Sequence, residues 1–416
     1  MIAFIKRLWL DRRGSALIIA GVTLPVLVGA AGLAVDTIQW TMWKRQLQRA
    51  ADSAAFAGVY AKVENNAGMT AEQAVASDLA KHNMTGITLL SGYPQIAYPN
   101  PSGYTDAVQV TLAIQKTLGF SSLFMSQAPI ITTTGTAAVS EEYTYCVDSR
   151  SDSGPGIIIA GSTNVYLGCG AISNSTDSVN SVDVNGTGHT FIAEPVAAVG
   201  GIDGTINGSP ILRPLALGTD DVYADLSTDI PDGMPCANFN NPSQTNADGS
   251  KKPGCYDSFN LGGGTVNLSP GVYYLNSTDI NLTGQERLVG TGVTIILTGS
   301  DPGSLTMSGN SSMDLTAPTT GTYANMVLIQ ASNADTGNNN TINGDNNTAL
   351  DGVIYFPVGD LTFSGSSAGA TQCAMIVGWT ITFTGNANIQ NTLVRPDGTP
   401  CRAAEQVDGR KVRLIA

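Results

Sequence analysis

The residues best suited to chemistry in this 416-residue chain are acidic, and they lie close together between positions 220 and 232. Hydrolysis of a glycosidic bond needs two carboxyl groups about 5 Å or ~6.5–9.5 Å apart. This stretch offers five candidates, with a solvated loop as the alternative: Asp220, Asp221, Asp225, Asp229 and Asp232. Arg287 is the only basic residue between 262 and 394, which disfavours a lyase, and His189 lies in a Gly-rich turn typical of a structural histidine. We therefore expect no enzyme and assign no catalytic residue.

The cysteines indicate disulfides rather than a metal site. All six follow residue 145, and an even number in a translocated domain favours disulfides over free structural thiols: Cys146, Cys169, Cys236, Cys255, Cys373 and Cys401. Fifteen pairings are possible. Sequential pairing (146–169, 236–255 and 373–401) would close loops of about 20–30 residues. No CxxC spacing occurs and only two histidines are present, which disfavours zinc. The residues around Asp335 and Asp345 do not match a calcium-loop pattern, so we expect no metal and no cofactor.

The charge of the chain is uneven along its length. Residues 146–416 carry 10 basic and 24 acidic side chains. Nucleic-acid binding needs clustered lysine and arginine, so we expect no nucleic-acid partner. An acidic body is typical of a soluble surface outside the cytoplasm.

The region 146–416 has the pattern of an all-β domain. One five-residue pattern, with large apolar residues at positions one and three and glycine at position five, recurs at 280–284, 305–309, 361–365 and 381–385. Degenerate repeats of this kind predict a right-handed parallel β-helix, in which stacked coils supply the core. A β-sandwich is the alternative. The asparagine-rich stretches 337–341 and 344–348 are predicted to form corners.

The N-terminal residues predict a membrane anchor. Residues 1–14 form a basic tail and 15–35 an apolar segment long enough to cross a bilayer, with Pro25 inside it. Basic residues before the span favour a cytoplasmic N-terminus and place the body across the membrane. A cleaved signal peptide, which would make the protein a secreted β-helix, is the alternative.

Residues 36–145 predict a helical stalk followed by a small α+β unit. Apolar side chains recur at helical spacing from Trp40 to Ala61, and this stripe would pack either on another helix or on the protein's own domain. Thr70–Asn83 predicts a second helix with a capping box. Strands are predicted at Asp106–Gln115 and Ile130–Val139.

Two N-terminal stretches resemble a known family. GLAVD at 32–36 and RQLQRAADSAAFAGV at 45–59 are similar to the signature of TadE/TadG-like proteins of Flp (tight adherence) pilus assembly. The residues that match this signature are Gly32, Asp36, Leu47, Gln48, Ala50, Ala51, Asp52, Ala54 and Ala55. The surroundings of Cys169 and the stretch 351–357 resemble the β-rich C-terminal part of some TadG-like proteins.

The resemblance implies a structural or accessory component of a Tad pilus system that takes part in cell adhesion. Its partners would be the inner membrane and other pilus-assembly components or pilins, with surface glycans as a further candidate. The protein would be a single-pass inner-membrane protein with its body in the periplasm or at the cell surface. The alternative is a membrane-tethered or secreted β-helix that binds or cleaves glycans.

The chain departs from the family pattern at two places. Ile19 stands where pilins of this system carry glutamate five residues after a cleaved glycine, here Gly14, so pilin-type processing is not expected. The spacing in 148–152 differs from the metal motif of the von Willebrand A domain found in many TadG-like proteins.

Overall fold

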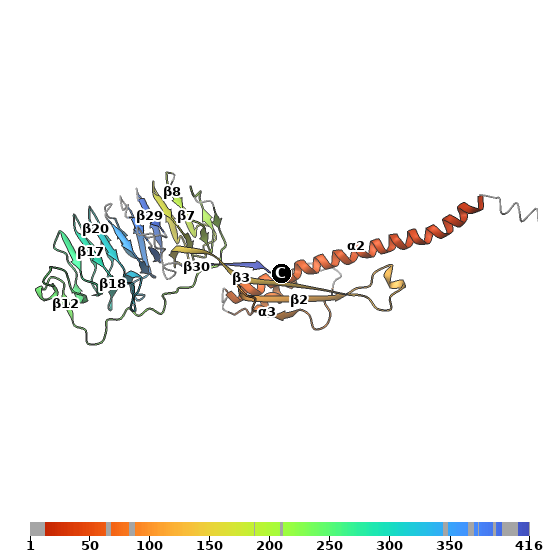
Figure 1. The fold of residues 1–416 in the computed structure, drawn as a ribbon, viewed down its shortest axis with the longest axis horizontal. Helices are drawn as coiled ribbons and strands as arrows, with labels where there is room; N and C mark the ends of the chain where they lie inside the picture. Colours follow the sequence, from red (N-terminus) through yellow and green to blue (C-terminus); the bar gives the residue numbers. More distant parts are fainter. Residues whose placement is uncertain are drawn as a thin grey trace, which may run out of the picture. The chain divides into compact units, whose positions relative to one another are not determined.

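The computed structural model describes residues 13–63, 68–82, 88–186, 188–208, 211–343, 348–364, 370–372, 374–385, 388–392 and 407–415. These residues form two compact units (Figure 1). The first contains the described residues up to Ser140 together with those from Val412 onward, and the second contains those from Glu141 to Lys411.

Helix α2 dominates the first unit and runs without interruption over Arg13–Val63. The predicted span and the start of the predicted stalk are therefore one helix. Within it, the hydroxyl of Thr23 donates to the carbonyl of Ile19 (2.8 Å), which satisfies the polar group inside an apolar segment. Val22 and other apolar side chains of this segment are more than half exposed. Among the described residues, α2 is the one helix long and apolar enough to cross a membrane.

A short helix and an antiparallel sheet complete the first unit. Helix α3 covers Ala71–Lys81 and begins with the predicted capping box, formed by Thr70 and Gln73. Strand β2 pairs on one side with β1 and on the other with β3, and the 3-10 helix η1 lies between β2 and β3. The bounds are β1 Gln95–Ala97, β2 Thr105–Gln115, η1 Ser121–Leu123 and β3 Ile130–Ser149. The predicted strand Asp106–Gln115 is confirmed as β2, in which the alternating residues Val108, Val110, Leu112 and Ile114 are fully buried.

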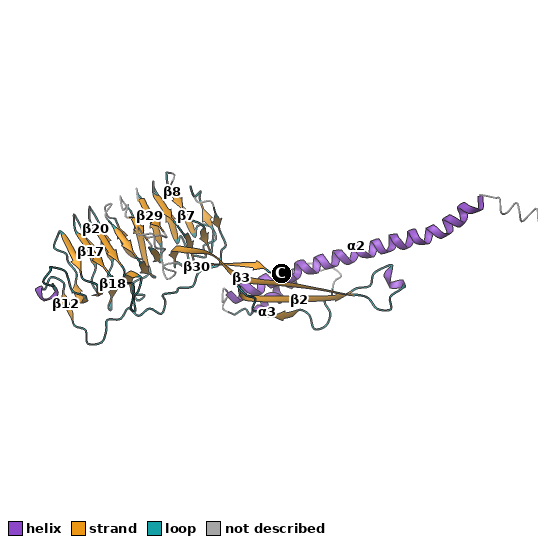
Figure 2. Cartoon of the chain, viewed as in Figure 1, coloured by secondary structure: helices purple, strands orange, loops and turns teal. Residues whose placement is uncertain are grey.

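The second unit is a β-solenoid of about nine turns (Figure 2). The predicted parallel β-solenoid is confirmed, and the β-sandwich alternative is wrong, because neighbouring coils in the described part of the solenoid pair through parallel strands. One face is a sheet that includes the end of β3 and the strands β6 Gly170–Ser173, β9 Val196–Ala198, β11 Leu212–Arg213, β12 Cys236–Asn238, β13 Gly254–Ser258, β15 Gly271–Asn276, β18 Val293–Thr298, β21 Met326–Gln330, β24 Val353–Phe356 and β27 Met375–Gly378.

Further sheets form the rest of the wall. The second contains β4 Ile157–Ile159, β7 Val182–Val184, β10 Ile202–Asp203, β16 Ile280–Leu282, β19 Leu305–Met307, β22 Asn338–Ile342, β25 Gly359–Phe363 and β28 Ile381–Phe383. Two shorter sheets contain β14 Thr265–Leu268, β17 Arg287–Thr291, β20 Ser312–Thr316 and β23 Ala349–Asp351, and β5 Asn164–Leu167, β8 Thr190–Ile192, β26 Ala370–Gln372 and β29 Asn388–Thr392. Strand β30, Val407–Leu414, pairs with β3, and the 3-10 helix η2 covers Pro242–Gln244.

The coils do not stack in the order of the sequence. Strand β3 lies between β27 and β6, and β4 lies between β28 and β7. The chain therefore enters the solenoid in the middle and builds coils toward β11. It then crosses to β12 at the opposite end and returns until its last coils stack on its first. This seam joins Ile381 to Ile157 across more than two hundred residues of sequence.

The repeat predicted from sequence corresponds to one face of the solenoid. Strands β16, β19, β25 and β28 belong to one sheet, with Ile280 opposite Leu305 and Leu361 opposite Ile381. Four further members of that sheet, β4, β7, β10 and β22, escaped the sequence pattern. In β22 an asparagine takes the inward place of a leucine, since Asn340 lies opposite Leu361.

The prediction that residues 337–341 form a corner is wrong for most of that stretch. Only Gly337 has the positive φ of a turn, at 78°, and Asn338–Ile342 is strand β22. Asn340 is 1% exposed. Its amide oxygen accepts the N–H of Leu305 (2.9 Å) and its amide nitrogen donates to the carbonyl of Asn338 (2.8 Å). These bonds allow a polar side chain inside the solenoid. The second predicted corner, 344–348, falls mostly outside the described residues.

Candidate functional site

The best-defined site of the first unit is at Asp36, where the apolar part of α2 ends. Its carboxylate accepts the backbone N–H of Phe120 (3.1 Å), the backbone N–H of Ser121 and the hydroxyl of Ser121 (2.6 Å). Both donor residues belong to the loop between β2 and β3, whose residues Leu118–Met125 we call the hairpin tip. Hydrogen bonds to an ionised acceptor are the stronger kind, so Asp36 fixes the hairpin tip to the helix.

Gly32 makes room for the hairpin tip one turn before Asp36. A Cβ atom at this position would overlap the ring of Phe120, and a Cβ at Gly29 would lie 3.8 Å from the tip of the same ring. The ring of Phe120 therefore lies on a surface of α2 that lacks side chains at these two positions. Gly32 and Asp36 act together, because one admits the hairpin tip and the other binds it.

After Asp36, two tryptophans of α2 each have the amine of a lysine over the ring. The amine of Lys44 lies 5.2 Å from the ring centre of Trp40, and Lys116 lies at the same distance from Trp43. Lys116 comes directly after β2, so the second pair joins the helix to the start of the hairpin loop. Tryptophan and lysine are the residues typical of a lipid–water boundary.

The small-residue face of α2 packs inside the first unit. Leu47, Ala50, Ala51, Ala54 and Ala55 are at most 1% exposed. Gly135 on β3 approaches so closely that a Cβ there would lie 2.6 Å from the backbone of Ala51. The sequence left open whether this face packs on another helix or on the protein's own domain. The structure shows that it packs on the protein's own sheet. The buried stripe is rotated from the predicted one, because Ala57 and Ala61 are half-buried.

Gln48 and Asp52 connect the helix to the sheet. The amide nitrogen of Gln48 donates to the carboxylate of Asp52 (2.8 Å) and to the carbonyl of Thr134 on β3 (2.9 Å). Each residue of the 32–55 signature thus has a structural place: a glycine under the hairpin tip, an acid that binds it, and a polar pair and small residues that hold the sheet.

Residues 14–63 match the model of one protein family, whose description is "Putative Flp pilus-assembly TadE/G-like". Helix α2 is therefore similar to the TadE/G-like segment of that family. The match begins and ends within one residue of the helix, so the family segment and the structural element coincide. No curated protein and no solved structure matches the chain. The solenoid lies outside the residues of the TadE/G-like match.

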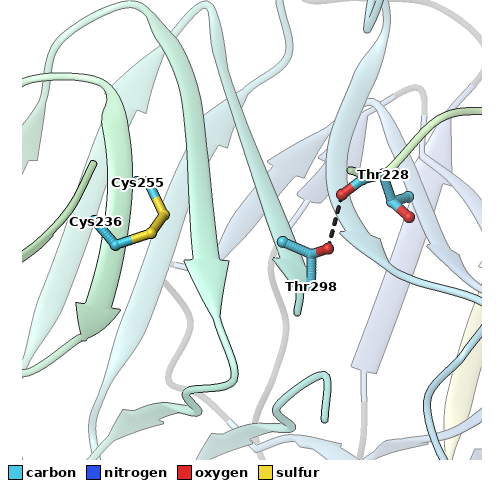
Figure 3. Close-up of a disulfide and its surroundings, with 4 residues drawn as sticks. All are labelled: Thr228, Cys236, Cys255 and Thr298. Carbon is cyan, nitrogen blue, oxygen red and sulfur yellow. Dashed lines mark hydrogen bonds between the residues drawn. A yellow bond between two sulfur atoms is a disulfide. The ribbon is translucent and has the colours of Figure 1, made fainter. Parts of the chain in front are cut away.

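The solenoid contains two disulfides, which are two of the sequential pairs considered above. Cys146 bonds to Cys169 and Cys236 to Cys255. Cys236 and Cys255 are register partners on β12 and β13 (Figure 3), and the other bond joins β3 to the residue before β6. Both bonds therefore tie one coil to the next. Cys373 and Cys401 lie outside the described residues.

The acidic stretch lies in a strap, residues 214–235, which carries the chain from β11 to β12 along the solenoid. The hydroxyl of Tyr355 on β24 donates to Asp221 (2.9 Å). Farther along, the hydroxyl of Thr298 on β18 donates to the carbonyl of Thr228 (2.7 Å; Figure 3). These contacts lie on different coils, with β21 between β24 and β18, so the strap binds several coils of the stack.

The aspartates of the strap are spread over different coils. Asp220 pairs with Arg410 (3.1 Å), and Asp221 binds Tyr355, whose pKa is raised mainly by burial and further by the Asp221 charge. Asp229 lies beside Tyr323, which comes just before β21. Two of the five carboxylates therefore have structural partners, and Asp221 and Asp229 face different coils.

A buried polar cluster anchors the start of the strap. Asp148, at the end of β3, is 1% exposed. Its carboxylate accepts from the side chains of Asn174 (2.6 Å), Thr219 (3.0 Å) and Arg150 (3.4 Å). Burial raises the pKa of Asp148 to about 7, although the charge of Arg150 acts in the opposite direction. The carboxyl group thus ties the strap to the coil where the chain enters the solenoid.

His189 and Arg287, the two other residues considered for chemistry, both have partners within the protein. His189 is 4% exposed, and its ring nitrogens pair with the carbonyl of Gly186 (2.8 Å) and the backbone N–H of Asn207 (3.2 Å). Arg287 pairs with Asp314 (3.0 Å).

Sequence reasoning missed the hairpin tip. Residues Leu118–Met125, between the two predicted strands, have the sequence LGFSSLFM, and nothing in this pattern connects them to Asp36 more than eighty positions earlier. The signal that could have found the pair is the combination of a carboxylate at the end of an apolar segment and an aromatic loop.

Proposed function

We propose that the protein is a membrane-anchored structural or accessory component of a Tad/Flp pilus assembly, or tight adherence, system. The observation that carries this proposal is the family match over residues 14–63. It coincides with a helix whose first half exposes apolar side chains and whose second half packs on its own sheet.

The proposed topology is a single pass, with the N-terminus in the cytoplasm and the body in the periplasm or at the cell surface. Arg13 and the basic residues before it support this orientation, because positive charge favours the cytoplasmic side. The two disulfides support an oxidising compartment for the solenoid.

The proposed role of the solenoid is contact with pilus components or with a surface, and glycans are the second candidate ligand. A stack of parallel coils offers long, regular side surfaces. The structural partners of Asp220 and Asp221 favour binding over catalysis. A panel of glycans incubated with the full-length protein tests this choice. Turnover that disappears in Asp225→Asn or Asp232→Asn would support the enzyme alternative.

Deletion of the gene in a pilus-bearing host tests the proposed function. We expect loss of pilin from the sheared surface fraction and loss of adhesion, with both restored by the wild-type gene. Gly32→Leu should restore less than Gly21→Leu, because a Cβ at Gly32 overlaps the hairpin tip and one at Gly21 has no atom within 4 Å. A deletion strain with normal pili and normal adhesion would contradict the proposal.

A further inference from the structure

The hairpin tip exposes large apolar side chains beside the apolar part of α2. Leu123 is 72% exposed, Phe124 77% and Met125 48%. The rings of Phe120 and Phe124 lie 5.4 Å apart, so the tip forms one apolar surface. Leu33 and Val35 on the neighbouring helix are also more than half exposed. The exposed apolar surface of the helix therefore continues onto the loop.

The position of Phe120 along α2 gives the depth of the hairpin tip. Its ring lies on Gly29 and Gly32, which precede Val35, the last apolar residue before Asp36, by six and three residues. At 1.5 Å per residue the ring is ~5–9 Å inside the apolar segment. The uncharged segment from Gly14 to Val35 is ~33 Å long, against ~30 Å for a hydrocarbon core. The excess of ~3 Å is too small to keep the ring out of the lipid.

The backbone N–H groups of the hairpin tip do not need water as a hydrogen-bond acceptor. The N–H groups of Phe120 and Ser121 donate to Asp36. Each following N–H, from Ser122 to Met125, donates to a carbonyl oxygen of the tip itself. All six consecutive N–H groups are thus satisfied within the protein, which lowers the cost of bringing this stretch of backbone into contact with lipid.

We propose that the hairpin tip inserts into the membrane leaflet beside α2, so that the protein contacts the bilayer through a helix and a loop. The ligand is the lipid surface itself. The inference rests on the proposed membrane anchoring of α2. Lys116 and Trp43, paired at the start of the loop, lie where interfacial anchors are expected. Insertion at a second point would limit rotation of the anchored protein about the axis of α2.

Site-specific fluorescence in vesicles tests the insertion. A polarity-sensitive fluorescent amino acid replaces Phe124 in the full-length protein, which is reconstituted in phosphatidylcholine vesicles with or without brominated lipid. Val28, in the apolar segment, is the control for lipid contact. Met69 is the control for water contact, because it is 49% exposed and lies beyond the end of α2. We expect brominated lipid to quench the probe at 124 at least half as strongly as the probe at 28, with little quenching at 69.

Two results would overturn the inference and leave the anchor intact. In the first, the probe at 124 behaves like that at 69 while the probe at 28 is quenched. In the second, the probe at 124 is shielded from both brominated lipid and aqueous iodide, which would indicate a second copy of the chain as the occupant. Absence of quenching at 28 would instead contradict the membrane anchoring on which the inference rests.

Discussion

Replacement of Phe383 by alanine examines the seam at which the last coils of the solenoid stack on the first. Phe383 is fully buried. Its ring lies 5.5 Å from Phe363, on the preceding coil, and 5.6 Å from Phe191, which belongs to an early coil. Removal of a buried phenylalanine side chain costs ~3–5 kcal/mol. We expect Phe383→Ala to lower the free energy of unfolding by about 4 kcal/mol.

A double-mutant cycle makes the test specific for the seam. Phe383→Ala and Phe191→Ala are measured singly and together by denaturant unfolding of the full-length protein in detergent, followed by circular dichroism of the β-sheet. Aromatic pairs at this distance contribute ~0.5–1.5 kcal/mol beyond their burial, so we expect a coupling of about 1 kcal/mol. Residues without contact are additive within ~0.3–0.5 kcal/mol. Additive effects would refute the stacking of late coils on early ones.

Three further predictions concern single residues. Gly32→Leu should displace the hairpin tip and speed amide exchange across it, whereas Gly21→Leu should leave exchange unchanged; equal exchange in both variants would contradict the role of Gly32. Cys255→Ser removes the disulfide to Cys236, which lies 19 residues away in the sequence, and should lower the free energy of unfolding by ~3 kcal/mol. An unchanged unfolding midpoint would show that the bond does not stabilise the end coil. The folded-state pKa of Asp148, about 7, lies above its ordinary value of 3.8, so its stabilising contribution is full below pH 4 and is lost as the pH rises through 7. At ~1.4 kcal/mol per pKa unit, stability relative to Asp148→Asn should fall by about 4 kcal/mol between pH 4 and 8; parallel pH profiles would refute this.

Local patterns could be predicted from the sequence because neighbouring residues determine them. The capping box at Thr70 and Gln73 and the alternation along β2 follow from the periods of helix and strand. The five-residue repeat can be recognised in β16, β19, β25 and β28, where two apolar residues are followed by threonine or serine and then glycine. The pattern misses β22 because a polar residue, Asn340, stands at its inward position. The structure accommodates this side chain through a hydrogen bond between its amide oxygen and the N–H of Leu305 on the neighbouring strand.

The long-range arrangement could not be predicted, because pairings between distant residues leave no local pattern. Nothing at Ile157 indicates that its neighbour is Ile381. The aspartates of the strap resembled a candidate catalytic cluster because composition does not reveal Tyr355 as a partner. The signature residues Gly32 and Asp36 were found by resemblance alone, and their common contact with the hairpin tip required the structure.

Topology and processing of the intact chain test the central claim, a TadE/G-like helix that anchors an extracytoplasmic solenoid. We would express the full chain with a C-terminal tag in a diderm bacterium, separate the membrane and soluble fractions, and measure the intact mass. We expect an uncleaved, membrane-bound chain whose body is accessible to protease only from the periplasm. A soluble chain that begins near Val35 would contradict it, because α2 would then be a signal peptide rather than an anchor.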